Sequence, residues 1–264
     1  MTGHVTAPAA ALADDLPSWA TLVRAPNPGP MTLDGTNTWV LRALGASGCV
    51  VVDPGPDDPG HLQAVSAYGP VESVHLTHGH DDHVGGLARF LALTDARLDA
   101  PYPGLRIEHL PTPGHTADSV CYLVATESGD EPAVLTGDTI LGRGTTVVAW
   151  PDGDLGDYLA SLEQLIELGN IPVLPGHGPA LASCGAAARF YLAHRRARLD
   201  QVRAAVAGGA TTAQDVVALV YADVDRSLWW AAEWSVRAQL AYLDSRDPPD
   251  SRESGSTPPE LSPP

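Results

Sequence analysis

Hydrophobic positions in the amino-terminal part of the chain alternate between short β-type runs and helical patterns. Residues 36–44 (TNTWVLRAL) and 49–55 (CVVVDPG) predict strands, because branched and aromatic residues follow one another between turn sequences. Residues 57–69 (DDPGHLQAVSAYG) predict a helix that begins at acidic capping residues. A short strand at 71–77 and a further helix at 85–93 follow. This order of elements is typical of a layered α/β structure.

The same alternation continues through the middle of the chain. Residues 105–114 and 119–138 predict paired strands joined by polar turns, 153–169 predict an amphipathic helix, and 171–178 predict a strand that ends in a loop. Strands that alternate with helices over this length indicate sheets that are covered by helices. We therefore expect an α/β domain in which helices flank the sheets.

The character of the chain changes after residue 185. Helical patterns follow one another at 186–209, 211–224 and 225–246. The remaining residues are rich in proline and serine, a composition that favours disorder. We therefore expect, in chain order, a flexible leader (1–16), the α/β domain (17–185), a helical appendage (186–246) and a disordered tail (247–264).

The charge of the chain limits its partners. Its 264 residues include 32 acidic and 15 basic side chains, which gives a net charge of −17, and every basic residue is an arginine. Such a chain has no global attraction for nucleic acids or anionic membranes, so an anionic substrate must bind to a local patch or to a metal. The absence of lysine also excludes a P-loop, because its phosphate-binding motif requires one.

Cysteine content and hydropathy indicate the compartment. The three cysteines lie far apart and form no CxxC motif, which favours reduced thiols over a disulfide framework. The amino-terminal residues lack the pattern of a signal peptide, and no apolar run reaches the roughly 18 residues that a membrane span needs. We expect a cytoplasmic protein that does not bind membranes, and the oligomeric state is left open.

One segment concentrates metal-binding side chains. In THGHDDHVGG, residues 77–86, the side chains of His78, His80, Asp82 and His83 follow directly after a predicted strand. The first two histidines lie two residues apart in an extended turn and can face one point, while the aspartate and the last histidine can face a second. Imidazole nitrogen together with carboxylate oxygen suits Zn²⁺, with Mn²⁺ or Fe as alternatives. A polar solvent loop is a poor explanation for so many ligands in one turn.

Three further segments repeat the arrangement of strand, turn and ligand. His115 lies in TPGHTADS, Asp138 in LTGDTILGRG and His177 in LPGHGP. Each alone would be explained as a turn residue or a buried histidine, but in combination they predict two metal sites. Three protein ligands per metal leave an open position, as in catalytic rather than structural sites, and a lone carboxylate such as Asp138 can bridge two metals.

This set of residues resembles the motif H-x-H-x-D-H, with a later His, Asp and His, of the metallo-β-lactamase superfamily. The resemblance covers residues 22–185 and implies an αβ/βα four-layer sandwich with a dinuclear zinc site between the sheet edges. It implies that one zinc is held by His78, His80 and His115, the second by Asp82, His83 and His177, and both by a bridging Asp138. It also implies that Asp53, in VVDPGP, supports a ligand from behind.

The residue at the bridging position and the segments that flank the motif indicate which branch of the superfamily the chain resembles. Aspartate at the bridging position excludes the zinc β-lactamases that have cysteine there, and resembles the glyoxalase II and RNA-processing branches. Residues 27–41 and 137–162, together with the helical carboxy-terminal segment, resemble the beta-lactamase-like protein 2 group. This resemblance implies a zinc hydrolase with a small, winged-helix-like helical appendage, and implies that at least some members cleave single-stranded RNA.

The expected chemistry is hydrolysis without a protein nucleophile. Two zinc ions would lower the pKa of a bridging water towards neutrality. We expect the metal-bridging hydroxide to attack the substrate, with Asp82 and Asp138 as the catalytic residues that orient it and carry its proton. No GxSxG nucleophile motif is present. The acidic surface favours a small acyl substrate with a thioester, ester or β-lactam-type bond, as in glyoxalase II-like or β-lactamase-like activity.

Two alternatives stay open at this point. Residues 186–206 carry five arginines and one acid, a basic stripe that fits an endoribonuclease acting on single-stranded RNA. The stripe also fits a solvated helix face whose arginines pair with neighbouring acids. The second alternative is a non-catalytic metal-binding scaffold. Alanine at His80 or Asp138 would distinguish it, because only an enzyme would lose turnover.

Substrate contacts are assigned from weaker patterns. Arg143 follows shortly after the bridging aspartate, and Arg195 and Arg198 lie in the basic stripe, so each is a candidate for holding an anionic group. Asn37, in DGTNTW, is a candidate pocket residue or a turn amide. The tryptophans at 229, 230 and 234 are predicted to lie in the core of the appendage rather than to form a base-stacking platform.

Overall fold

The computed structural model of the protein describes residues 9–12, 16–148 and 150–246. Its strands form two sheets, in the orders β1-β2-β3-β4-β5 and β6-β7-β8-β9. The strands are β1 (Ala20–Arg24), β2 (Asn37–Leu41), β3 (Cys49–Val52), β4 (Val71–His75), β5 (Arg97–Leu98), β6 (Leu105–Pro111), β7 (Val120–Thr126), β8 (Ala133–Gly137) and β9 (Val173–Pro175). The helices are α1 (Pro59–Ser66), α2 (Asp81–Val84), α3 (Leu87–Thr94), α4 (Leu155–Ile166), α5 (Cys184–Ala207), α6 (Ala213–Val220), the 3₁₀ helix η1 (Arg226–Leu228) and α7 (Trp229–Arg246).

Each sheet combines antiparallel and parallel pairing. In the first sheet β1, β2 and β3 are antiparallel neighbours, whereas β3, β4 and β5 run parallel. In the second sheet β6, β7 and β8 are antiparallel neighbours, and β8 and β9 run parallel. The carboxyl ends of β3 and β4 therefore meet at one edge, as do those of β8 and β9. The loops after β4, β8 and β9 carry most of the predicted metal ligands.

The two sheets pack face to face through alternate residues of their strands. Val50 and Val52 of β3 face the second sheet, whereas Val51 between them faces the helices. From the second sheet, Leu135 of β8 and Leu174 of β9 enter the same inner core. All five side chains are buried. Both faces of the central strands are covered, which explains why these strands are continuous apolar runs in the sequence.

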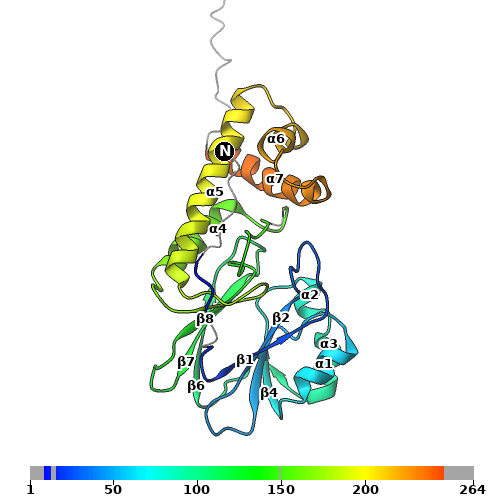
Figure 1. Ribbon diagram of the computed structural model, residues 1–264, viewed down its shortest axis with the longest axis vertical. Coiled ribbons are helices and arrows are strands. Elements are labelled where there is room, and N and C mark those ends of the chain that lie inside the picture. Colours follow the sequence, from blue (N-terminus) through cyan, green and yellow to red (C-terminus); the bar gives the residue numbers. More distant parts are fainter. Residues whose placement is uncertain (1–8, 13–15, 149, 247–264) are drawn as a thin grey trace, which may run out of the picture.

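Helices cover the outer faces of both sheets and complete four layers (Figure 1). On the first sheet, Leu62 of α1 and Phe90 of α3 form a core with Val51. On the second sheet, Tyr158 of α4 and Tyr191 of α5 pack in the core that contains residues of β8 and β9. The α/β class predicted from the sequence is therefore confirmed as an αβ/βα sandwich.

Helices α5, α6 and α7 form the predicted appendage at one end of the molecule (Figure 1). Helix α5 packs against both the sandwich and the appendage. Tyr191 in its first half packs with the sandwich, whereas Val202 near its end packs with Val216 of α6 and Val236 of α7. Helix α7 also contacts α4. The described residues from 212 to 246 hold helices and no strand.

Part of the predicted leader contacts the sandwich. The Leu12 N–H donates to the Ala180 carbonyl at 2.8 Å, and the Ala182 N–H donates to the Ala10 carbonyl at 2.9 Å. Most of the remaining predicted leader, and the whole predicted tail at 247–264, lie outside the described residues. Among the helices that the structure describes, none combines the length and the apolar character of a membrane span.

Candidate metal centre

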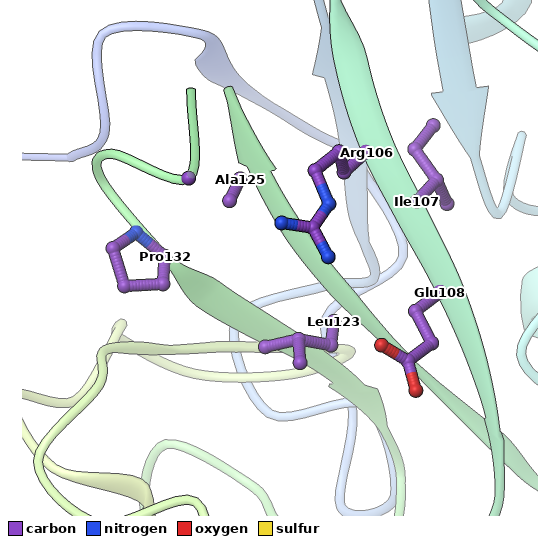
Figure 2. A pocket seen from close by; sticks show the side chains of 7 residues that line it. Arg106, Ile107, Glu108, Leu123, Ala125 and Pro132 are labelled. Carbon is purple, nitrogen blue, oxygen red and sulfur yellow. The ribbon is translucent and has the colours of Figure 1, made fainter. Parts of the chain in front are cut away.

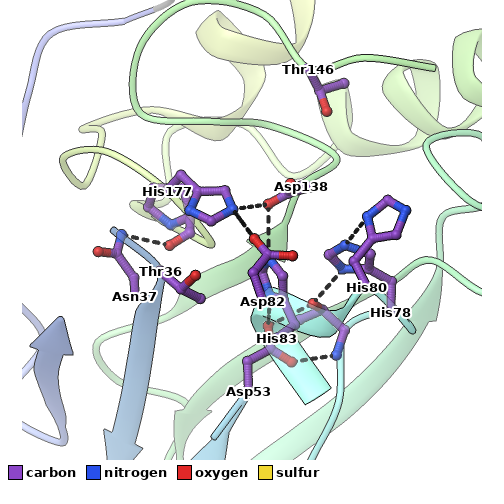
Figure 3. Close-up of polar contacts among 12 residues, drawn as sticks. Thr36, Asn37, Asp53, His78, His80, Asp82, His83, Asp138, Thr146 and His177 are labelled. Carbon is purple, nitrogen blue, oxygen red and sulfur yellow. Dashed lines mark hydrogen bonds and ion pairs between the residues drawn. The ribbon is translucent and has the colours of Figure 1, made fainter. Parts of the chain in front are cut away.

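All but one of the predicted metal ligands lie just beyond the carboxyl ends of parallel strands (Figure 3). They are His78 and His80 after β4, Asp82 and His83 on α2, Asp138 after β8, and His177 after β9. The exception, His115, lies in the turn between β6 and β7. Because β6 and β8 both run antiparallel to β7, this turn reaches the same edge as Asp138. The structure thus brings all the predicted ligands together.

Three histidines form the first cluster. The Nε2 atoms of His78 and His115 lie 3.0 Å and 3.1 Å from Nδ1 of His80. The opposite ring nitrogens are held from behind, since Nδ1 of His78 lies 3.1 Å from Thr77 Oγ1 and Nδ1 of His115 lies 2.5 Å from the Val147 carbonyl. A ring N–H that donates to a carbonyl leaves the other nitrogen with a free lone pair, so Nε2 of His115 is available to a metal.

One aspartate and two histidines form the second cluster. His177 Nε2 lies 3.2 Å from His83 Nε2 and 3.1 Å from Asp82 Oδ2. Both imidazoles are fully buried, whereas 28% of the Asp82 side chain is exposed. Nδ1 of His177 lies 3.3 Å from the Gly35 carbonyl, which leaves Nε2 directed at the cluster. This cluster therefore opens to solvent on the side of its carboxylate.

Asp138 lies between the two clusters. Its Oδ1 is 3.4 Å from Nε2 of both His83 and His177, and its Oδ2 is 3.8 Å from Nε2 of His115. Oδ1 is buried without a hydrogen-bond partner. The ligand atoms of His78, His83 and Asp138 lie within 4.8 Å of one another, as do those of each triad. One carboxylate is thus placed to contact ions in both clusters.

Glycines allow the ligand loops to approach this closely. A Cβ atom at Gly176 would lie 2.6 Å from Asp138 Oδ1 and 2.7 Å from His83 Cε1. Gly137, at the end of β8, has a φ of 46°, and a Cβ there would overlap the side chain of Thr77. Both positions therefore exclude a side chain.

Asp53 holds His83 of the second cluster through the ring nitrogen that faces away from the centre. It follows β3 with a φ of 54°, an uncommon conformation for a residue other than glycine. Its Oδ1 accepts the Thr77 N–H at 2.8 Å, and its Oδ2 accepts from Thr77 Oγ1 at 2.6 Å and from His83 Nδ1 at 2.8 Å (Figure 3). Because His83 donates from Nδ1, its Nε2 is the nitrogen that faces the centre and that a metal would bind in place of a proton.

Burial and neighbouring charges shift the pKa values of these groups. Burial lowers the pKa of His78 well below its usual value, and adjacent histidines lower it further. Burial also disfavours charge on His83 and His177, but nearby carboxylates outweigh it, so the pKa of His83 is raised well above its usual value and that of His177 is raised to about 9. The two imidazoles likewise hold the pKa of Asp138 well below its usual value despite burial. Without metal, the second cluster holds protons on its histidines at neutral pH.

Asn37 connects strand β2 to the loop after β9. Its side chain is fully buried, and its Nδ2 donates to the carbonyls of Pro175 at 2.9 Å and Gly178 at 2.8 Å. Both amide N–H groups therefore hold the loop that carries His177, and neither is free for a substrate. The residue is also not the turn amide that the sequence offered as the alternative, because it begins strand β2 and its partners lie 138 and 141 residues away.

Arg143 lies beside the centre. It lines a hollow of about 190 Å³ together with His115 and Asp138. Its guanidinium pairs with Asp34, with Nη2 2.8 Å from Oδ1, and its side chain is 46% exposed. The position matches a substrate contact, but the charge is shared with an acid.

The arginines at 195, 196 and 198 do not form an open basic stripe on α5. Arg195 is only 3% exposed and donates to the Thr146 carbonyl. Arg196 pairs with Glu163 at 2.8 Å, and Arg198 donates to a backbone carbonyl of α6 at 2.6 Å. The alternative of a helix face paired with acids holds for Arg196, and for Arg198, which lies 3.9 Å from Asp223, but not for the buried Arg195.

The prediction that the tryptophans lie in the core of the appendage is wrong for two of them. Trp230 and Trp234 are 46% and 41% exposed, and their rings meet edge to face with centroids 4.9 Å apart. The core side of α7 is formed instead by Ala232 and Val236. Only Trp229 packs against that core, and its indole N–H donates to a backbone carbonyl at 3.1 Å.

Three residues around the ligands had no predicted role. Thr77 binds Asp53, while Thr146 Oγ1, 3.3 Å from His115 Nδ1, and the Val147 carbonyl hold His115. The role of Thr77 was accessible from strand pairing, because β3 and β4 lie in parallel and end side by side. No local pattern connects Thr146 to a histidine 31 residues earlier.

The side chains fit a pair of divalent metal ions. Each cluster offers imidazole nitrogens, with carboxylate oxygens in the second and between the two, and this donor set suits Zn²⁺ and other transition metals. The unpartnered Oδ1 of Asp138 supports the same conclusion, because a buried carboxylate oxygen normally has a partner.

The chain belongs to the metallo-β-lactamase superfamily, as its fold and its ligand set indicate. The profile of the Metallo-beta-lactamase superfamily matches residues 31–106, and that of the Beta-lactamase associated winged helix domain matches residues 212–247. Members of the superfamily are generally metal-binding hydrolases. Among named proteins, the chain is similar to Beta-lactamase-like protein 2 homolog of Drosophila melanogaster, with 30% identity over 259 residues, or 83% of this chain and 85% of the relative.

Other relatives extend the comparison. The chain is 32% identical to the thioesterase pkgB of Emericella nidulans over 203 residues, or 69% of this chain and 57% of the relative. A metallo-beta-lactamase family protein from Thermus thermophilus has the same fold, with 22% identity, a TM-score of 0.70, and coverage of 86% of this chain and 94% of that one. A protein solved in a di-iron-bound form, TTHA1623, has 26% identity and a TM-score of 0.50 over 64% of this chain and 98% of that one.

A separate hollow of about 330 Å³ lies on β6 and β7 (Figure 2). Its lining includes Arg106 and Glu108 beside apolar residues such as Leu123 and Pro132. It contains no histidine or cysteine, so it offers no alternative to the metal centre.

Proposed function

We propose that the protein is a dinuclear zinc hydrolase that cleaves small acyl substrates, above all thioesters. The observation that carries the proposal is the place of Asp138 between two sets of three ligands. A set of three protein ligands leaves a position open for the reaction. Zinc suits the mixed imidazole and carboxylate donors, and Fe and Mn²⁺ are the alternatives that metal analysis distinguishes.

Metal ions held here would supply Lewis acidity, which polarises a substrate carbonyl and acidifies a water molecule. The chain supplies positioning and proton transfer. Burial acts to raise the pKa of Asp82, but contacts with His177 and His83 lower it below its usual value. Asp82 is therefore ionised at neutral pH, and its partly exposed carboxylate would accept a proton and pass it on to the leaving group.

Acyl substrates fit the surroundings of the centre better than RNA does. A nucleic-acid path needs clustered, accessible positive charge, whereas Arg195 and Arg198 donate to backbone carbonyls and Arg196 pairs with Glu163. The net charge of −17 opposes such a path further. The similarity to a protein named as a thioesterase supports the acyl reaction.

We also propose a cytoplasmic location. Cys49, Cys121 and Cys184 are all free and buried in the structure. Free thiols in a chain of this size are typical of a reducing compartment, which supports the proposal.

The test compares two substrate panels with the same zinc-loaded preparation. One panel holds small thioesters, an aryl ester and a chromogenic lactam, and the other holds labelled single-stranded RNA. We expect thioester turnover that His80→Ala abolishes, with the RNA left intact. His109→Ala is the matched control, because His109 is an exposed histidine of β6, outside both clusters.

Two outcomes would overturn the proposal. RNA cleavage that His80→Ala abolishes, with no thioester turnover, would make the protein a ribonuclease. Absence of turnover on both panels by fully metal-loaded protein would favour a metal-binding scaffold.

A further inference from the structure

Two neighbouring hollows lie between the metal centre and the helical appendage. The first, of about 190 Å³, includes His115 and Asp138 in its lining. The second, of about 230 Å³, lies between the sandwich and helices α5 to α7. The segments 30–31 and 145–147 line both hollows. The second hollow, which we call the appendage groove, therefore adjoins the hollow at the site of the proposed reaction.

The wall that the appendage contributes is mostly apolar. Val224, Leu228, Ala231 and Ala232 line the appendage groove from the connection before α7 and from α7 itself. Met31 lines it from the sandwich and is 37% exposed. Ala231 and Ala232 are buried, whereas Val224 and Leu228 stay partly exposed, as Met31 does. Partly exposed apolar side chains beside a reaction site provide a binding surface for an apolar group, because covering them removes apolar area from water.

Two of the polar side chains of the groove, Thr146 and Arg198, are already hydrogen-bonded within the chain. Thr146 lies 3.3 Å from His115 through its hydroxyl, and its carbonyl accepts from Arg195. Arg198 donates to the Val220 carbonyl at 2.6 Å, with its guanidinium over the ring of Tyr221. Nδ1 of His194, which also lines the groove, is buried without a hydrogen-bond partner, so the groove offers an occupant a polar contact beside its apolar wall.

The groove is also free of negative charge. No aspartate or glutamate lines it, on a chain with a net charge of −17. His194 lines it as a neutral group, because burial, with Arg195 and Arg198 nearby, lowers the pKa of its ring to about 4. The one cation of the lining, Arg198, already donates to a backbone carbonyl, so a mostly apolar lining without acids matches the non-reacting body of a substrate.

We propose that the appendage groove binds the apolar body of the acyl group, so that the preferred substrates are thioesters of medium-chain or aromatic acids rather than of acetate or lactate. This inference rests on the proposed thioester hydrolysis and names its substrate class. Dry cavities of about 150 Å³ accommodate a benzene molecule. The appendage groove is larger, at about 230 Å³, and so accommodates a group larger than one benzene ring.

The first experiment measures kcat/KM for a series of N-acetylcysteamine thioesters with acetyl, hexanoyl, decanoyl and 2-naphthoyl groups. Each methylene that enters an apolar site is expected to raise kcat/KM by about threefold to fourfold until the groove is full. We therefore expect decanoyl and naphthoyl thioesters to exceed the acetyl thioester by at least about a hundredfold.

Two variants should move this selectivity in opposite directions. Ala231→Leu fills the groove and should lower the ratio of decanoyl to acetyl turnover by about tenfold or more. Leu228→Ala enlarges the groove and should shift the optimum to longer acyl chains. Ala193→Leu is the matched control, because Ala193 is an exposed residue of α5 that does not line the groove, and its selectivity should equal that of the wild type. Partial unfolding would lower turnover of all substrates alike and leave the ratios unchanged.

A binding measurement separates this proposal from the proposed reaction. Titration of metal-depleted protein with decanoate, 2-naphthoate and acetate should show saturable binding of the first two only, and Ala231→Leu should weaken it. Equal turnover of all thioesters, unaffected by both groove variants, would overturn the groove proposal while leaving the hydrolase intact. Decanoate binding without turnover of any thioester would support the groove proposal and overturn the proposed function. No binding of either apolar acid would overturn the groove proposal.

Discussion

The variant Asp53→Asn tests how the chain orients His83 for metal binding and sets which of its ring nitrogens carries a proton. Asp53 accepts hydrogen bonds from the Thr77 N–H at 2.8 Å, from Thr77 Oγ1 at 2.6 Å and from His83 Nδ1 at 2.8 Å. Asparagine keeps the shape of this side chain but replaces one acceptor oxygen by an amide that donates. If the amide faces His83, the ring must accept at Nδ1 and carry its proton on Nε2, which blocks the metal-binding nitrogen. If the amide turns the other way, it meets the Thr77 N–H as a second donor.

The expected loss of metal affinity follows from the loss of the hydrogen bond between Asp53 and His83. Mutations of groups that orient metal-binding histidines typically reduce metal affinity by about 10- to 100-fold. This corresponds to about 1.4 to 2.8 kcal/mol. The loss should fall on the cluster of Asp82, His83 and His177, since no histidine of the other cluster contacts Asp53. Nδ1 of His78 and Nδ1 of His115 face Thr77 and Val147 instead. The buried, mismatched donor should also lower the free energy of unfolding by about 1 to 3 kcal/mol.

The assay is a chelator competition in which bound metal per chain is measured by elemental analysis. We expect Asp53→Asn to lose one equivalent at a chelator concentration about 10- to 100-fold lower than the wild type does, and to lose the other together with the wild type. Asp57→Asn is the control, because Asp57 is an exposed acid that pairs with Arg89. Loss of both equivalents at wild-type chelator concentrations in Asp53→Asn would refute the reasoning.

Three further predictions follow from the same geometry. Gly176→Ala places a methyl group 2.7 Å from His83 Cε1, so metal content should fall by at least one equivalent. The control Gly208→Ala, at the end of α5, should keep its metal content. Unchanged metal content in Gly176→Ala would contradict the close packing at this glycine. The pKa of His177 is raised to about 9 and that of His83 well above its usual value, so both carry protons at pH 7 and metal must displace them. Calorimetry in buffers of different ionisation enthalpy should show release of about two protons per pair of metals at pH 7 and tighter binding as pH rises; no release would contradict these protonation states. Arg195→Met should loosen the segment 145–147 and weaken metal at the three-histidine cluster, measured by chelator competition, whereas an unchanged affinity would show that this contact does not position the ligand.

The layered fold was predictable because both faces of the central strands are buried. The runs CVVV and AVLTG have no polar side to face water, so they require covering layers on each side. The two-residue strand β5 was missed, since Arg97 and Leu98 are exposed and carry no pattern. The shared role of α5 was also missed, because its apolar residues do not reveal that its two halves face different cores.

The ligand set was predictable because each ligand follows a strand, whereas contacts that depend on three-dimensional packing were not. The arginines of α5 resembled a nucleic-acid surface in sequence, yet Arg195 is buried and Arg196 pairs with an acid from α4. Exposure of Trp230 and Trp234 was likewise not predictable, because helical spacing does not show which side of α7 meets the core. The burial of the arginines and the exposure of the tryptophans both depend on which distant segments pack against the helix.

The most direct test of the central claim is the metal content of the purified protein and of one variant from each cluster. The account predicts two equivalents in the wild type, and a loss in both His80→Ala and His177→Ala that removes thioester turnover in each. Zinc should predominate, and iron or manganese at the same stoichiometry would change the metal but not the site. A wild type that binds no more than one equivalent under saturating metal, or that turns over thioesters equally well after complete metal removal, would contradict the account.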